Sequence, residues 1–217
     1  MTEKIDAAIK RLNEILPLKE GQEKISSQLK SLYQQILNSF VSKGRILSKE
    51  EMRGYVNDVE AAIKILEENE MVIVSENREV IGAYPFTMED REYKVRVNGF
   101  EVNAMCAIDA LAISMMYDVN TQITSRCRIT DAPIYLEQSG TQISNFDESR
   151  DIHICIAWEA AETVLKCANS LCTEMFFASS YKVATTWQKN EFKKREIFTL
   201  NEAMEFSRRF FGSLVFL

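Results

Sequence analysis

Histidine is almost absent from this sequence of 217 residues, in which His153 is the only one. A Ser-His-Asp arrangement or a histidine-rich metal site therefore has only that residue to use. No two of the 5 cysteines have the CxxC spacing of common zinc fingers and thioredoxin-like sites. Their odd number, in a protein expected to be cytoplasmic, argues against a disulfide framework. The five are Cys106, Cys127, Cys155, Cys167 and Cys172.

Long apolar runs and an excess of basic residues are also lacking. No apolar run reaches the roughly 18 residues of a membrane span, and the charged N-terminus MTEKIDAAIKRLNEIL lacks the apolar centre of a signal peptide. Acidic residues outnumber basic ones by 32 to 26, which argues against nucleic acid as the main partner. We therefore expect a cytoplasmic protein with neither a membrane nor a nucleic acid as its partner.

The first 85 residues are predicted to be mainly helical. KIDAAIKRLNEIL has the apolar spacing of one helical face, a longer helix is expected at about 22–41, and Ser48 with Glu51 fits a capping box. After the helix VNDVEAAIKILEEN, the segments MVIVS and VIGAYPF predict a two-stranded wing. This order indicates a winged-helix-like subdomain at 1–85.

A winged helix raises the possibility of a DNA-binding regulator whose C-terminal part senses a metal. The candidate recognition helix, 57–70, carries five acidic residues and one lysine, Lys64. Phosphate would repel such a helix. A structural or partner-facing role is therefore the preferred interpretation of this subdomain.

The pattern changes to short strands after residue 92. YKVRV and FEVNA flank an Asn-Gly pair, which is the strongest short signal for a hairpin. The segments TQITSRCRI and IYLEQS predict a second hairpin. Further strands are expected at DIHICIAW and EMFFASS, and helices at YKVATTWQKNEF and LNEAMEFSRRFFGSL, whereas EAAETVLKCANSL fits either a short helix or an irregular connection.

The stretch NAMCAIDALAISMM, at 103–116, places a thiol and a carboxylate together in an apolar helix. We expect Asn103 to be the N-cap, with Cys106 in the first turn, where free N–H groups and the helix dipole favour a thiolate. Asp109 lies three residues further on the same face, so the two groups could relay a proton. On pattern alone, however, a cysteine in such a helix is more often a small core residue.

Three segments taken in order resemble the organomercurial (alkylmercury) lyases: AMCAIDAL, ITSRCRITDAPIYL and SLCTEMFFASSYKVATTW. In that family a Cys-Ala-x-Asp motif follows a short hairpin. A cysteine about twenty residues later precedes a turn with Ala-Pro, and a final cysteine precedes an aromatic strand and a tryptophan. Here these elements are Cys106 to Asp109, Cys127, and Cys172 with Trp187, within roughly 90–190.

The resemblance implies an enzyme that cleaves carbon–mercury bonds by protonolysis. It implies that Cys106 and Cys172 bind and activate mercury. Asp109 would also contact the mercury and would handle the proton, whereas Cys127 would have a structural role. Thiolates suit so soft a metal. No organic cofactor is implied. Hg(II) would remain as bound product and leave to small thiols, and a mercuric reductase is one possible protein acceptor.

Some positions depart from the family pattern. Met105 precedes Cys106 where some members have an aromatic residue, and with Phe176 and Phe177 it is a candidate wall for the organic group. Cys155 and Cys167 are extra to the pattern. We expect Cys155 to face the core, and Cys167, five residues before Cys172, is either a core residue or an accessory thiol.

The sequence thus predicts an α+β fold. A winged-helix-like subdomain at 1–85 packs on a small mixed or antiparallel sheet domain with flanking helices at 86–217, which carries the site. The alternative to a lyase is a non-enzymatic relative that uses the two thiols to bind Hg(II) or Cu(I). Such a protein needs the sulfurs but not Asp109, so the presence of all three residues favours the enzyme.

Overall fold

The computed structural model describes residues 2–163, 166–189, 191–212 and 214. Within these residues, no helix is both long and apolar enough to cross a membrane. Three expected segments, 159–171, 181–192 and 200–214, each include a residue outside the described part of the chain. Statements about those segments apply only to their described residues.

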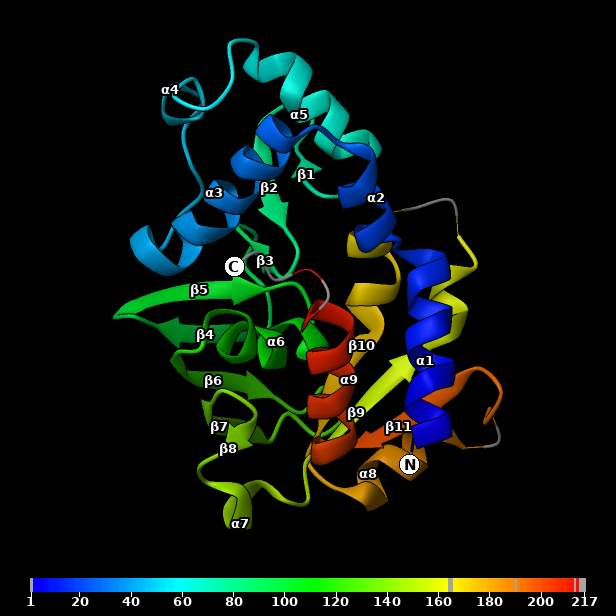
Figure 1. The fold of residues 1–217 in the computed structure, drawn as a ribbon. Helices are drawn as coiled ribbons and strands as arrows, with labels where there is room; N and C mark the ends of the chain where they lie inside the picture. The colour runs from blue at the N-terminus through cyan, green and yellow to red at the C-terminus, as the bar shows by residue number, and fades with distance from the viewer. Residues whose placement is uncertain (1, 164–165, 190, 213, 215–217) are drawn as a thin grey trace.

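Helices form most of the N-terminal region (Figure 1). Each apolar face is buried, as the helical spacing predicts. The helices are α1 (Thr2–Ile15), α2 (Leu18–Lys24), α3 (Ser27–Lys43), α4 (Lys49–Met52) and α5 (Val59–Glu68). A short hairpin follows, in which β1 (Ile73–Val74) pairs with β2 (Val80–Ala83).

The larger sheet is antiparallel and has 8 strands in the order β1-β2-β3-β5-β4-β6-β7-β8. The β1–β2 hairpin therefore continues into the sheet of the C-terminal region, because β3 pairs with both β2 and β5. The new strands are β3 (Phe86–Thr87), β4 (Tyr93–Val97), β5 (Phe100–Ala104), β6 (Asn120–Arg126), β7 (Pro133–Ser139) and β8 (Gln142–Ile143). A short helix, α7 (Phe146–Ser149), follows β8.

A second, three-stranded antiparallel sheet lies beside the first, in the order β10-β9-β11. Its strands are β9 (His153–Ala157), β10 (Met175–Ala178) and β11 (Arg195–Thr199). The described residues between β9 and β10 form three 3-10 turns: η1 (Trp158–Ala161), η2 (Cys167–Asn169) and η3 (Leu171–Glu174). Helix α8 (Tyr181–Gln188) connects β10 to β11, and α9 (Leu200–Gly212) is the last helix.

Helix α6 (Ala107–Tyr117) occupies the centre of the molecule. It contacts β4 to β7 of the large sheet on one side and α9 on the other, and α1 in turn covers α9 (Figure 1). Its residues 107–114 are all buried. The start of α6 is therefore excluded from water, which sets the conditions for the chemistry of the site.

Most of the expected elements are confirmed, including the Asn98-Gly99 hairpin, whose two residues have the positive φ values (49° and 84°) that such a turn requires. The capping boxes at Ser48 and Thr199 are also present. The single helix expected at 22–41 is wrong, because the chain is extended at Ile25 and a new helix begins after the N-cap Ser26.

Two further differences concern strands. Strand β11 was not expected, although it pairs along its whole length with β9. The large sheet extends beyond the C-terminal region, because it also includes β1 and β2; its pairings are all antiparallel, which is one of the two expected arrangements.

One buried hydroxyl links α9 to the first turn of α6, since Ser207 Oγ donates to the Ile108 carbonyl oxygen at 3.0 Å. Replacing Ser207 with alanine should lower the free energy of unfolding by about 1 kcal/mol. Ser42 makes a similar bond to Asn38 on an exposed helix face and provides the matched control. Urea denaturation should show a loss for Ser207→Ala and almost none for Ser42→Ala; equal losses would contradict this account of the link.

Candidate active site

Cys106 is the N-cap of α6. Its Sγ accepts the backbone N–H of Asp109 at 3.4 Å, and its carbonyl accepts that of Ala110 at 3.0 Å. The expected N-cap, Asn103, is wrong: it lies in β5, where its side chain accepts a hydrogen bond from Lys94 at 2.7 Å. Cys106 therefore stands at the helix entrance rather than in its first turn. Its sulfur still faces free N–H groups and the positive end of the helix dipole.

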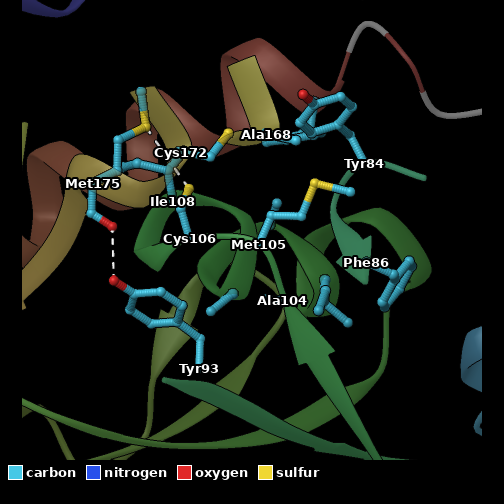
Figure 2. Close-up of a cluster of buried hydrophobic side chains, with 14 of the residues drawn as sticks. Tyr84, Phe86, Tyr93, Ala104, Met105, Cys106, Ile108, Ala168, Cys172 and Met175 are labelled. Atoms are coloured by element: carbon cyan, nitrogen blue, oxygen red, sulfur yellow. Dashed lines mark hydrogen bonds between the residues drawn. The ribbon is translucent and has the colours of Figure 1, made fainter. Parts of the chain in front are cut away.

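Cys172 reaches the same place from a distant part of the sequence. It lies in η3, directly before β10, and β10 packs against α6. The sulfurs of Cys106 and Cys172 and a carboxylate oxygen of Asp109 all lie within 4.8 Å of one another. Met175 adds a thioether sulfur 3.8 Å from Cys106 Sγ, and Figure 2 shows these sulfurs gathered above the start of α6. The structure thus brings together the three residues that the sequence singled out.

The cluster is closed off from solvent. Cys106, Asp109 and Cys172 are 1%, 2% and 3% exposed. Asp109 Oδ2 is buried and, among the described residues, has no hydrogen-bond partner. A buried, unpaired carboxylate oxygen is costly. The carboxyl group is therefore held in an environment that favours its protonated form.

The pKa values of the cluster follow from this burial. Burial raises the pKa of Asp109 to about 7, although the Cys106 thiol, the backbone at Cys106 and the charge of Arg91 act in the opposite direction. Burial also raises the pKa of Cys106 to about 11, against a lowering by the hydrogen bond from Cys172. The pKa of Cys172 is raised by its contacts with Cys106 and then Cys167, and by burial. These shifts all favour the protonated form of the two thiols and of the carboxyl group.

Arg128 and Tyr93, which were not singled out from the sequence, fix the segment that carries Cys172. Arg128 donates to the Thr173 carbonyl oxygen, pairs with Glu92 at 3.2 Å, and lies over the ring of Phe176 at 4.7 Å. Tyr93 donates to the Met175 carbonyl oxygen at 3.0 Å (Figure 2). A lone arginine in a turn gives no sequence signal for this role, because its partners lie far from it in the sequence.

Two tyrosines from the N-terminal region close the site on its other side. Tyr84 is buried, and its pKa is raised by burial first and then by electrostatic interaction with Cys172, Cys167 and Asp109. Tyr33 supports it from α3, since its hydroxyl donates to the Tyr84 carbonyl oxygen at 3.5 Å. No pattern in the sequence singles out either residue.

The three candidate wall residues are buried. Met105, Phe176 and Phe177 are 2%, 1% and 0% exposed. Met105 directly precedes Cys106 beneath Tyr84 (Figure 2), whereas Phe176 packs edge-on against Trp187 at 5.2 Å between ring centroids. Phe177 packs against Tyr93 at 5.9 Å. Their role as walls for an organic group stays a prediction.

Cys127 lies directly after β6, outside the cluster. Its backbone N–H donates to the Ala132 carbonyl oxygen at 2.8 Å and its carbonyl oxygen accepts from Asp131 at 2.7 Å. Burial acts to raise the pKa of its thiol, but hydrogen bonds with Thr130 and Ser179 outweigh it and lower the pKa to about 7. These contacts join the β6–β7 hairpin to Ser179, which directly follows β10. Cys155 is buried in β9, so the expectation that it faces the core is confirmed.

The family model of MerB, described as alkylmercury lyase, matches residues 86–212. This chain therefore belongs to the alkylmercury lyase family, whose members cleave carbon–mercury bonds. Among solved structures, it is similar to the mercury-bound form of MerB2. The TM-score is 0.71 and the identity 21%, over 91% of this chain and 98% of that one. At that identity the structural likeness supports the shared fold.

The raised pKa of Asp109 predicts a pH-dependent stability difference. An aspartate in an unfolded chain has a pKa of about 3.9, whereas burial raises that of folded Asp109 to about 7. The folded state thus binds the proton more tightly, and the free energy of unfolding falls as the pH rises between these values. Asp109→Asn removes this loss and should be more stable than the wild type at about pH 8, by about 4 kcal/mol.

Urea denaturation of both proteins across this pH range tests the prediction. The advantage of Asp109→Asn should shrink as the pH falls and disappear below about pH 4, where Asp109 is protonated in both states. Asp118→Asn, at the exposed other end of α6, is the control for the loss of a carboxylate from the same helix. An Asp109→Asn advantage that stayed constant with pH would show that Asp109 does not titrate in this way.

Proposed function

We propose that this chain protonolyses carbon–mercury bonds, with Cys106 and Cys172 as the mercury-binding thiols and Asp109 as the proton-handling carboxylate. The observation that supports this most strongly is the joint placement of two thiols and an unpaired carboxylate oxygen in one buried cluster. Soft thiolates bind mercury strongly. A carboxyl group with a pKa near neutrality is suited both to accept a proton and to donate it.

The reaction can be balanced with these groups alone. Cys106 displaces the exchangeable ligand of the organomercurial cation, and that ligand leaves with one thiol proton. Cys172 then bonds to the metal, and its proton passes to Asp109. The second sulfur increases the electron density on carbon, the carbon–mercury bond breaks with its electron pair on carbon, and Asp109 protonates that carbon. A hydrocarbon leaves, and Hg(II) stays on both sulfurs without any change of oxidation state.

Several finer features form part of this proposal. No organic cofactor takes part, and low-molecular-weight thiols, or a protein such as a mercuric reductase, receive Hg(II). The residues 1–85 act as a winged-helix-like subdomain with a structural role. Support for that role comes from Tyr33 and Tyr84, which cover the site, and from the pair of Glu67 with Lys166 at 3.2 Å. The acidic face of α5 gives no support to binding of nucleic acid.

Phenylmercury turnover tests the lyase directly. With excess small thiol, the wild-type protein should release benzene, measured by gas chromatography, and Cys106→Ser should release none above a protein-free control. Cys155→Ala removes a buried thiol outside the cluster and should retain the wild-type rate. Absence of benzene from the wild type, with tight Hg(II) binding retained, would instead indicate a thiol protein that binds soft metals.

The role of Asp109 separates an enzyme from a metal-binding relative. Asp109→Asn keeps both sulfurs, so its affinity for Hg(II) should stay close to that of the wild type, while phenylmercury turnover should fall by about 10²- to 10⁴-fold because the proton donor is lost. Asp118→Asn is again the control. Unchanged turnover in Asp109→Asn would show that the proton comes from another group.

A further inference from the structure

A fourth cysteine lies beside the cluster, although it is not part of the family pattern. Cys167 Sγ is 3.5 Å from Cys172 Sγ, and both residues are 3% exposed. Cys172 therefore belongs to two thiol pairs, one with Cys106 and one with Cys167. Cys167 and Cys172 are only five residues apart in the sequence, but the regular spacing of a helix or a strand would not bring their sulfurs into contact.

The backbone holds this second pair in place. Two consecutive 3-10 turns, η2 and η3, carry the two cysteines, and Ser170 lies between them. Its N–H donates to the Cys167 carbonyl oxygen at 3.2 Å and its hydroxyl to the Lys166 carbonyl oxygen at 2.9 Å. Thr173 Oγ1 donates to the Ser170 carbonyl oxygen at 2.6 Å. These bonds fold the segment back so that both thiols face the same space.

The residues next to the second pair are more exposed than those next to Cys106. Cys106 is flanked by Met105 and Ala107, which are 2% and 0% exposed. In contrast, Cys167 follows Lys166, whose side chain is 39% exposed, and comes two residues before the exposed Asn169. Cys167 itself is buried, but the segment that carries it is flanked by residues that reach the solvent.

We propose that Cys167 and Cys172 form a second dithiol for Hg(II), which receives the ion from the Cys106–Cys172 pair after the carbon–mercury bond has broken. This inference rests on the proposed function. In the exchange, Cys167 sulfur bonds to mercury as the Cys106–mercury bond breaks, and the proton of Cys167 passes to Cys106. Mercury remains Hg(II) and stays bonded to Cys172 throughout.

The exchange has a physical advantage over direct release. An ion bound by two buried thiolates must otherwise wait for an external thiol to reach the start of α6. A third thiol in contact with Cys172 supplies the incoming ligand at a high effective concentration. Met175 cannot replace it, because a thioether has no proton to exchange. The two sulfurs must separate to admit the ion, and short 3-10 turns permit such an adjustment more readily than a helix does.

The test measures Hg(II) affinity, with mercuric chloride as the probe and a small dithiol as competitor. In Cys106→Ser only the proposed second pair remains, and it should still bind one equivalent of Hg(II) as a two-thiol site. The double variant Cys106→Ser/Cys167→Ser should bind at least about 100-fold more weakly, because one of two joined ligands is lost. Cys106→Ser/Cys155→Ala is the matched control and should bind as Cys106→Ser does.

Equal affinity of Cys106→Ser and Cys106→Ser/Cys167→Ser would overturn the proposal, and so would loss of Hg(II) binding in Cys106→Ser alone. Circular dichroism checks the fold of each variant, and Cys167→Ala provides a second substitution should serine disturb the turn. Because this test uses inorganic mercury, it is separate from the lyase assay. Retained binding by the second pair without benzene formation by the wild type would refute the lyase and leave the second dithiol standing.

Discussion

The exclusion of water from the start of α6 is the constraint on which the site depends. In water, a thiol and a carboxylic acid differ in pKa by more than four units, and the acid stays ionised at neutral pH. Burial raises the pKa of Asp109 to about 7, so this carboxyl group can both accept and return a proton. The same burial favours the protonated form of the Cys106 thiol, and the contacts of Cys172 with Cys106 and Cys167, together with burial, favour that of Cys172.

The fold builds this dry site from distant parts of the chain. Helix α6 contributes Cys106 and Asp109, and it is enclosed by the large sheet and α9. The turn before β10 contributes Cys172, and Arg128 and Tyr93 hold that turn through its backbone carbonyls. The N-terminal region supplies Tyr33 and Tyr84. The site therefore belongs to both regions of the chain, although the matched family model begins at residue 86.

Local signals in the sequence predicted much of the fold. The Asn98-Gly99 turn and the capping box at Ser48 depend on residues within a few positions, so they can be read directly. Asn103 failed as an N-cap because strand pairing, a long-range interaction, prevailed over its local preference. For the same reason β11 was missed.

The site could be predicted only in part. The motif resemblance selected Cys106, Asp109 and Cys172, and the structure shows that they meet. Residue spacing alone could not show this, since 66 residues separate the two cysteines in the sequence. The contact of Cys167 with Cys172 depends on the hydrogen bonds around Ser170, which no periodic pattern encodes.

The central claim is that a proton from an exchangeable group of this cluster ends on the carbon. Phenylmercury cleavage in deuterium oxide, with the benzene analysed by mass spectrometry, tests this claim most directly. Thiol and carboxyl hydrogens exchange with solvent, so the account predicts benzene that carries one deuterium. Benzene without deuterium would contradict it, because the hydrogen would then come from a carbon-bound source and the bond would not break by protonolysis.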